Sequence, residues 1–196
     1  MLARAATATN LLAHQSRFQL GIAAEVISTA CSIFVAGLFY ELLKPVNRSF
    51  SLVAAFFRLV ACAIAVVGYL LQLAPLQILG GAHSLSVPTP DQLQALALVL
   101  RFRAQASNML IVFFGFHFIV IGYLIFRSTF LPRILGVLVA FAGWGGLMFL
   151  APALASRIFP YFVGVGLVSE VSLALWLVVM GVNASKWRER GVQVDL

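Results

Sequence analysis

Four ionisable side chains interrupt the long apolar runs of this 196-residue sequence: Glu25, Arg58, His117 and Glu170. A guanidinium donates hydrogen bonds from a fixed planar fork, a carboxylate accepts them, and a neutral imidazole does both. Together these residue types could hold a proton or bind a polar group. An ionisable residue inside a membrane span is costly to bury, so each of the four is a functional candidate.

These four residues lie at similar depths along their apolar runs. At about 1.5 Å of helical rise per residue, all of them fall in a slab less than about 10 Å thick near the bilayer midplane. We expect Arg58 to pair with Glu170. Glu25 is then a second carboxylate. The surplus negative charge is removed by protonation of one carboxylate, or His117 helps to balance it.

Two interpretations of this predicted cluster stay open. The preferred one is a structural ion pair that fixes helix register, with His117 hydrogen-bonded to a neighbouring carbonyl. The alternative is a site that handles a proton or a substrate, because functional sites also gather ionisable groups.

No motif for catalysis or metal binding accompanies the cluster. The three histidines are scattered without metal-ligand spacing. The glycine-rich stretch 143–146 lacks the Lys-Ser/Thr that follows in a phosphate-binding loop, and no Gly-x-Ser-x-Gly or His-Glu-x-x-His occurs. We therefore predict no catalytic residues, no metal and no cofactor, and an intramembrane enzyme is the least favoured class.

The composition indicates a protein dissolved in lipid. Hydrophobic residues make up 62% of the chain and charged residues only 10%, whereas soluble domains carry roughly a quarter charged residues. The net charge of +7 comes from Lys and Arg at the ends of apolar runs. This distribution is typical of membrane-flanking cations and excludes nucleic acid as the expected partner. Cys31 and Cys62 lie inside apolar runs and are expected to be small buried hydrophobes.

The elements that position the cluster are predicted to be helices. The apolar runs predict an all-α integral membrane bundle, one domain over 1–196, with about five transmembrane helices. Their predicted bounds are about 18–43, 50–77, 105–127, 134–154 and 160–183. Arg101 and Arg103 favour an interfacial helix over 91–103 that bends into the third span. One long helix is the alternative, because no proline and no glycine before Gly115 interrupts this stretch.

Small residues recur four apart in the fourth run. Gly136 with Ala140, and Ala142 with Gly146, place small side chains on one helix face. Such faces let two helix backbones approach closely where no hydrophobic effect drives their association. We expect these residues to be helix-packing positions, and the alternative is that the glycines only loosen the helix.

The distribution of cations predicts the orientation. With antiparallel spans, the C-terminal side holds seven cations and the other side five. The first set comprises Lys44, Arg48, Arg127, Arg133, Lys186, Arg188 and Arg190, and the second Arg4, Arg17, Arg101, Arg103 and Arg157. The excess predicts a multi-pass protein of the inner (plasma) membrane with a cytoplasmic C-terminus.

Several segments resemble one known family. They are 43–48, 57–60, 113–117, 122–124, 130–138 and 170–177. Together they are similar to a family of uncharacterised bacterial multi-pass membrane proteins, the domain of unknown function family 4386, over nearly the whole chain. The resemblance implies an all-helical membrane fold and places Arg58, His117 and Glu170 at motif positions, with Glu25 less clearly part of the pattern. It implies no activity.

The same resemblance implies a departure at the N-terminus. Members of the family look as though they begin with a further transmembrane helix, which precedes a stretch like residues 5–12. This chain starts at that stretch. We therefore expect the first family helix to be lacking, either in the natural protein or because its start site is assigned too late.

Two functional classes lead from the sequence. The first is a non-enzymatic protein that binds or organises lipid, another membrane protein or a second copy of itself. The alternative is a small transporter or proton-linked carrier that uses Arg58, Glu170 and His117. A wet cavity reaching the cluster favours transport or catalysis, whereas a sealed cluster favours the structural interpretation.

Overall fold

All secondary structure in the described residues is helical. The computed structural model describes residues 15–80 and 89–194. In chain order the elements are α2 (Gln15–Leu43), α3 (Arg48–Gly80), α4 (Pro90–Arg127), α5 (Arg133–Leu147), the short 3-10 helix η1 (Met148–Leu150), α6 (Pro152–Val179) and α7 (Ala184–Val194).

The length and apolarity of these helices identify a membrane protein. Within the described ranges, four helical segments are long and apolar enough to cross a bilayer, and a shorter apolar segment lies in α6. The four are Gln19–Leu43, Arg48–Ala74, Pro90–Arg127 and Arg133–Leu150, and the shorter one is Gly164–Val179. The protein is therefore an all-α membrane helical bundle, as the composition predicts.

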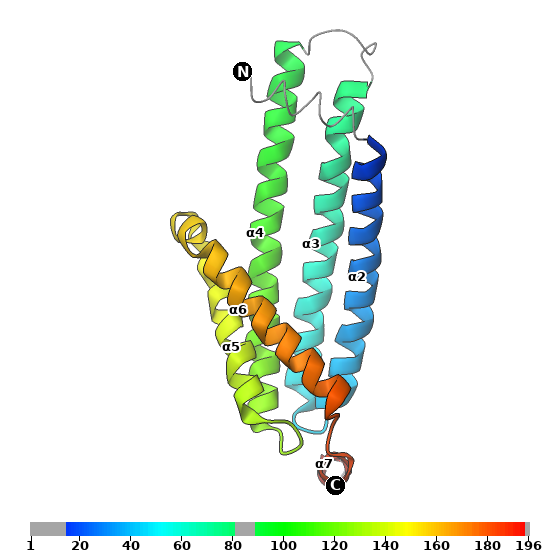
Figure 1. Ribbon diagram of the computed structural model, residues 1–196, viewed down its shortest axis with the longest axis vertical. Coiled ribbons are helices and arrows are strands. Elements are labelled where there is room, and N and C mark those ends of the chain that lie inside the picture. The colour runs from blue at the N-terminus through cyan, green and yellow to red at the C-terminus, as the bar shows by residue number, and fades with distance from the viewer. Residues whose placement is uncertain (1–14, 81–88, 195–196) are drawn as a thin grey trace.

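Three long helices form the body of the bundle. In Figure 1, α2, α3 and α4 run along the long axis of the molecule, and α5 lies beside the C-terminal half of α4. Helix α6 returns obliquely across the bundle toward the end of α2. Its extensive contacts are with α5 and η1, and α2 and α6 make at most slight direct contact.

Glycines bring α4 and α5 into backbone contact. A Cβ added to Gly122 would lie 2.5 Å from the backbone nitrogen of Ala140, and one on Gly136 would lie 2.6 Å from the backbone nitrogen of Phe126. Real side-chain carbons do not approach backbone atoms this closely, so only glycine fits at both positions. The close approach anchors α5 on α4 without large side chains between them.

The same interface continues toward η1. A Cβ on Gly143 would lie 2.7 Å from the carbonyl oxygen of Gly115, and one on Gly146 would lie 2.9 Å from the Gly115 Cα. Of the expected packing residues, Gly136, Ala140 and Gly146 thus lie at this interface, and Ala142 is buried on α5.

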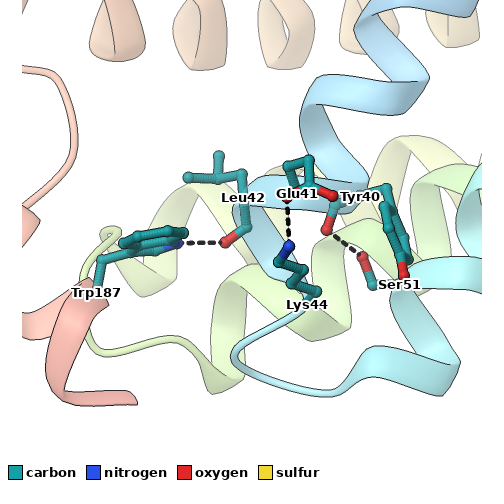
Figure 2. Close-up of polar contacts among 6 residues, drawn as sticks. All are labelled: Tyr40, Glu41, Leu42, Lys44, Ser51 and Trp187. Carbon is teal, nitrogen blue, oxygen red and sulfur yellow. Dashed lines mark hydrogen bonds and ion pairs between the residues drawn. The ribbon is translucent and has the colours of Figure 1, made fainter. Parts of the chain in front are cut away.

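At the end of the bundle near the α2–α3 turn, side chains donate hydrogen bonds to the last carbonyls of α2 (Figure 2). Trp187 of α7 donates its indole N–H to the carbonyl of Leu42 at 2.9 Å. Ser51 donates its hydroxyl to the carbonyl of Tyr40 at 3.0 Å. The final carbonyls of a helix have no partner within it, and Trp187 supplies one for Leu42. Ser51 is a second donor to the Tyr40 carbonyl, which also accepts the Lys44 N–H at 2.9 Å. The indole also ties α7 to the end of α2.

Two helices differ from the bounds expected from the sequence. Helix α4 runs unbroken from Pro90 to Arg127, capped by Thr89, which accepts from the Gln92 N–H. The expected bend between an interfacial helix over 91–103 and a span over 105–127 is therefore corrected to a single helix. The physical reason is that nothing in the stretch interrupts the backbone hydrogen bonds, and charges such as Arg101 and Arg103 do not break a helix.

Helix α6 also begins earlier than expected. It starts at Pro152 and continues through Pro160, the residue that the sequence suggested as its beginning. Proline is well suited to a first helical turn, and proline inside a membrane helix is tolerated where neighbouring groups satisfy the freed carbonyl. The helix ends at Val179, and Gly181 follows with a φ of 67°, a left-handed conformation that favours glycine.

Candidate functional site

A cavity of about 420 Å³ lies between α2, α4 and α6. Three ionisable side chains line it, namely Arg58, His117 and Glu170. The rest of its wall is apolar and comes mainly from α2 (Val35, Leu38, Phe39 and Leu42) and from α6 (Leu173, Ala174, Leu177 and Val178). Three of the four expected cluster residues therefore line one cavity, and the rest of its wall is apolar.

Arg58 is held by uncharged partners. Its Nε donates to the Ser32 hydroxyl oxygen at 2.8 Å, which connects α3 to α2. Its guanidinium carbon lies 4.2 Å from the centre of the Phe114 ring on α4. A guanidinium over an aromatic face is attracted by the ring quadrupole, more strongly where water is excluded. These two contacts fix the plane of the guanidinium beside the cavity.

His117 is buried and tied to α3. Its side chain is 3% exposed, and its Nδ1 lies 2.8 Å from the carbonyl oxygen of Ala54. Because a carbonyl only accepts, Nδ1 carries a proton, and Nε2 of the neutral imidazole is an acceptor. This hydrogen bond to a carbonyl is the one expected of His117 if the cluster has a structural role in fixing helix register.

Glu170 lies on the exposed surface of α6 and lines the same cavity. It is the carboxylate that acts electrostatically on Arg58. In the part of the chain that the structure describes, however, no ion pair within 4.0 Å joins the two side chains. The expected pair therefore shares a cavity without a direct salt bridge.

Glu25 lies apart from the other three residues. It lines a second cavity of about 190 Å³, whose other polar lining residues are Tyr69, Gln72, Arg103 and Ser107. The Oε2 atom of Glu25 is buried without a hydrogen-bond partner in the described structure. Thr29 donates to the Glu25 backbone carbonyl at 3.0 Å and shares a 2.8 Å hydrogen bond with the Tyr69 hydroxyl. The structure thus divides the expected cluster between two cavities.

Sequence reasoning missed the residues that hold Arg58. Ser32 and Phe114 are uncharged and unremarkable in an apolar run, so their types carry no signal by themselves. The walls of the cavity did leave a pattern, because Val35, Leu38 and Leu42 recur at intervals of three and four on α2. Such a face is indistinguishable from a lipid-facing one until the neighbouring helix is known.

The chemistry of the cavity is that of binding. Arg58 supplies donors, whereas His117 and Glu170 supply acceptors, and the remaining wall is apolar. Among the described residues, no group of three His, Cys, Asp or Glu side chains is placed to hold a metal ion. Apolar cavities with a few convergent polar groups are typical of small-ligand sites.

Comparisons with known proteins give a family and no activity. The family described as Domain of unknown function (DUF4386) matches residues 2–181. A relative from Archaeoglobus fulgidus, described as "Uncharacterized protein", is 27% identical over 157 residues, which is 79% of each chain. No solved structure matches the chain. The argument for function therefore depends on the geometry of the cavity.

Proposed function

Because the chain belongs to the family Domain of unknown function (DUF4386), whose description assigns no reaction, we propose a function from geometry. The protein is a non-enzymatic membrane protein that binds a largely apolar ligand with a polar group in the cavity between α2, α4 and α6. The observation that carries the proposal is this cavity of about 420 Å³, apolar over most of its wall and polar at Arg58, His117 and Glu170. Ligand pockets of small molecules have about this size and lining.

The exposed position of Glu170 supports a ligand or lipid as the partner. Glu170 lies nine residues before the end of α6, in the apolar segment Gly164–Val179. A carboxylate facing hydrocarbon without a donor is costly. A bound molecule that donates a hydrogen bond removes this cost, so the site is more favourable when filled.

The carrier alternative has less support from the same geometry. Arg58 and His117 are each tied to a neighbouring helix, by Ser32 and by the Ala54 carbonyl. The cavity around Glu25 is separate from the one around Arg58. Transport requires one continuous path, whereas binding requires only the first cavity.

The proposal is tested by filling the cavity. Purified protein in lipid nanodiscs is illuminated with an alkyl probe that carries a diazirine, and the labelled residues are identified by mass spectrometry. We expect labels on α2 at 35–42 and on α6 at 173–178. Ala174→Phe places a ring in the cavity and should reduce this labelling by roughly tenfold, the equivalent of about 1.4 kcal/mol.

The matched control is Val171→Phe, because Val171 is exposed on the same helix and does not line the cavity. This variant should label as the wild type does, and both variants are first checked for an unchanged melting temperature. Labelling spread evenly over the lipid-facing surface, or unaffected by Ala174→Phe, contradicts the proposal.

The membrane and the orientation are part of the same proposal. We place the protein in the plasma membrane with α7 on the cytoplasmic side, and bilayer lipid is its immediate partner. The support is the excess of Lys and Arg on the side of the α2–α3 turn, the start of α5 and α7.

A further inference from the structure

We propose that the ligand is an electrically neutral, single-chain amphiphile whose hydroxyl-bearing head lies among Arg58, His117 and Glu170. The inference rests on the proposed binding function and names the chemical class of the ligand. It follows from the shape of the cavity, from the hydrogen-bonding groups at its polar end and from the balance of charge there.

The shape of the cavity fits one hydrocarbon chain. Its two main walls are helical stripes, from Val35 to Leu42 on α2 and from Leu173 to Val178 on α6. At 1.5 Å per residue, each stripe is roughly 8–10 Å long. Because α2 and α6 make at most slight direct contact, the space between them is a slot with two facing apolar walls. Such a slot accepts a single chain from the bilayer more readily than a two-chain lipid.

The polar end of the slot offers both donors and acceptors. Arg58 uses its Nε for Ser32, and its terminal nitrogens have no hydrogen bond to any residue in the described ranges. His117 uses Nδ1 for the Ala54 carbonyl, which leaves Nε2 as an acceptor. Glu170 adds a carboxylate. A head group that fits must therefore accept from Arg58 and donate to His117 or Glu170, and a hydroxyl does both.

The balance of charge favours a neutral head. An arginine side chain is positively charged and a glutamate carboxylate negatively charged at neutral pH, and Arg58 and Glu170 line the same cavity. A carboxylate, phosphate or ammonium head would leave one charge uncompensated in the apolar part of the membrane, which is strongly unfavourable. An alcohol or a monoacylglycerol adds hydrogen bonds without adding charge. The same two residues therefore select against both anionic and cationic amphiphiles.

The test compares three diazirine-bearing probes of equal chain length, namely an alkyl alcohol, the matching carboxylate and the matching trimethylammonium. Full-length protein in nanodiscs of neutral lipid at pH 7 is labelled with each probe. We expect the alcohol to label the slot roughly tenfold more than either charged probe, since one uncompensated charge costs more than the 1.4 kcal/mol of a tenfold change. Equal or stronger labelling by a charged probe overturns the inference.

Single substitutions should shift the preference in opposite directions. Arg58→Gln leaves the Glu170 charge and should raise labelling by the trimethylammonium probe. Glu170→Gln leaves the Arg58 charge and should raise labelling by the carboxylate probe. The double variant should restore the preference for the alcohol. If Arg58→Gln does not fold, Glu170→Gln decides the matter, because Glu170 is exposed and makes no ion pair within the described structure.

The outcomes separate the two proposals. Labelling of the slot by all three probes alike overturns the neutral head and leaves the binding function standing. No labelling of the slot by any probe overturns both, because the cavity then holds no amphiphile at all.

Discussion

The guanidinium of Arg58 is stabilised in an apolar bundle without a carboxylate in contact. Ser32 accepts one hydrogen bond, and the Phe114 ring faces the cation at 4.2 Å. Glu170 contributes through space, across the cavity, because no salt bridge within 4.0 Å joins it to Arg58 in the described residues. This separation keeps both charged groups accessible to a ligand instead of neutralising each other directly.

The separation predicts weak thermodynamic coupling between Arg58 and Glu170. Breaking a contacting buried ion pair costs about 3–5 kcal/mol, with partial recovery in the double mutant. Here the coupling free energy from Arg58→Gln, Glu170→Gln and the double variant should be about 1 kcal/mol or less. Thermal unfolding of the four purified proteins in mild detergent measures it. A coupling of about 3 kcal/mol or more would mean that the two side chains form a direct pair in the membrane.

At the residue scale, the sequence indicates which residues are unusual but not which of them line the same cavity. Arg58, His117 and Glu170 are visible because ionisable side chains are rare in apolar runs, and all three line one cavity. Glu25 has a similar predicted depth and lies in another cavity. Depth is only one coordinate, and the direction in which a side chain points around its helix depends on packing that one sequence does not reveal.

At the scale of elements, glycines bring the backbones of α4 and α5 into contact. Gly115 and Gly122 on α4 face Gly143 and Gly136 on α5 through backbone contacts. The small-residue spacing in the fourth run predicts a packing face, whereas its partner helix is known only from the structure. His117 is on α4, so the α4–α5 contact also helps to position the polar end of the slot.

The glycine contact predicts a large effect of one methyl group. Gly122→Ala places a Cβ 2.5 Å from the Ala140 backbone nitrogen, and backbone atoms cannot move away cheaply. We expect a loss of about 1–3 kcal/mol in the free energy of unfolding, the usual cost of overpacking. The control is Gly68→Ala, where a Cβ meets nothing within 4 Å and should stabilise the helix by up to about 1 kcal/mol. Equal melting temperatures for the two variants would contradict the close contact.

At the scale of the whole molecule, unequal helix lengths place part of the bundle outside the membrane. Helix α4 has 38 residues, or about 57 Å at 1.5 Å per residue, against a hydrocarbon core of about 30 Å. Figure 1 shows α3 and α4 extending together past the start of α2. The composition predicts the class and the helices of this fold. It does not predict the continuity of α4, because charged residues such as Arg101 and Arg103 favour a membrane surface without ending a helix.

The orientation gives the last prediction. Gln94 lies 33 residues before the end of α4, about 50 Å along the helix from Arg127, so it projects beyond the bilayer on the side opposite α7. In a background of Cys31→Ala and Cys62→Ala, we introduce Gln94→Cys or Ala184→Cys, both at exposed positions. A membrane-impermeant maleimide added to intact cells should label residue 94 only, and residue 184 should react only after permeabilisation, because the more cationic side faces the cytoplasm. The reverse pattern would mean that the protein has the opposite orientation in the membrane.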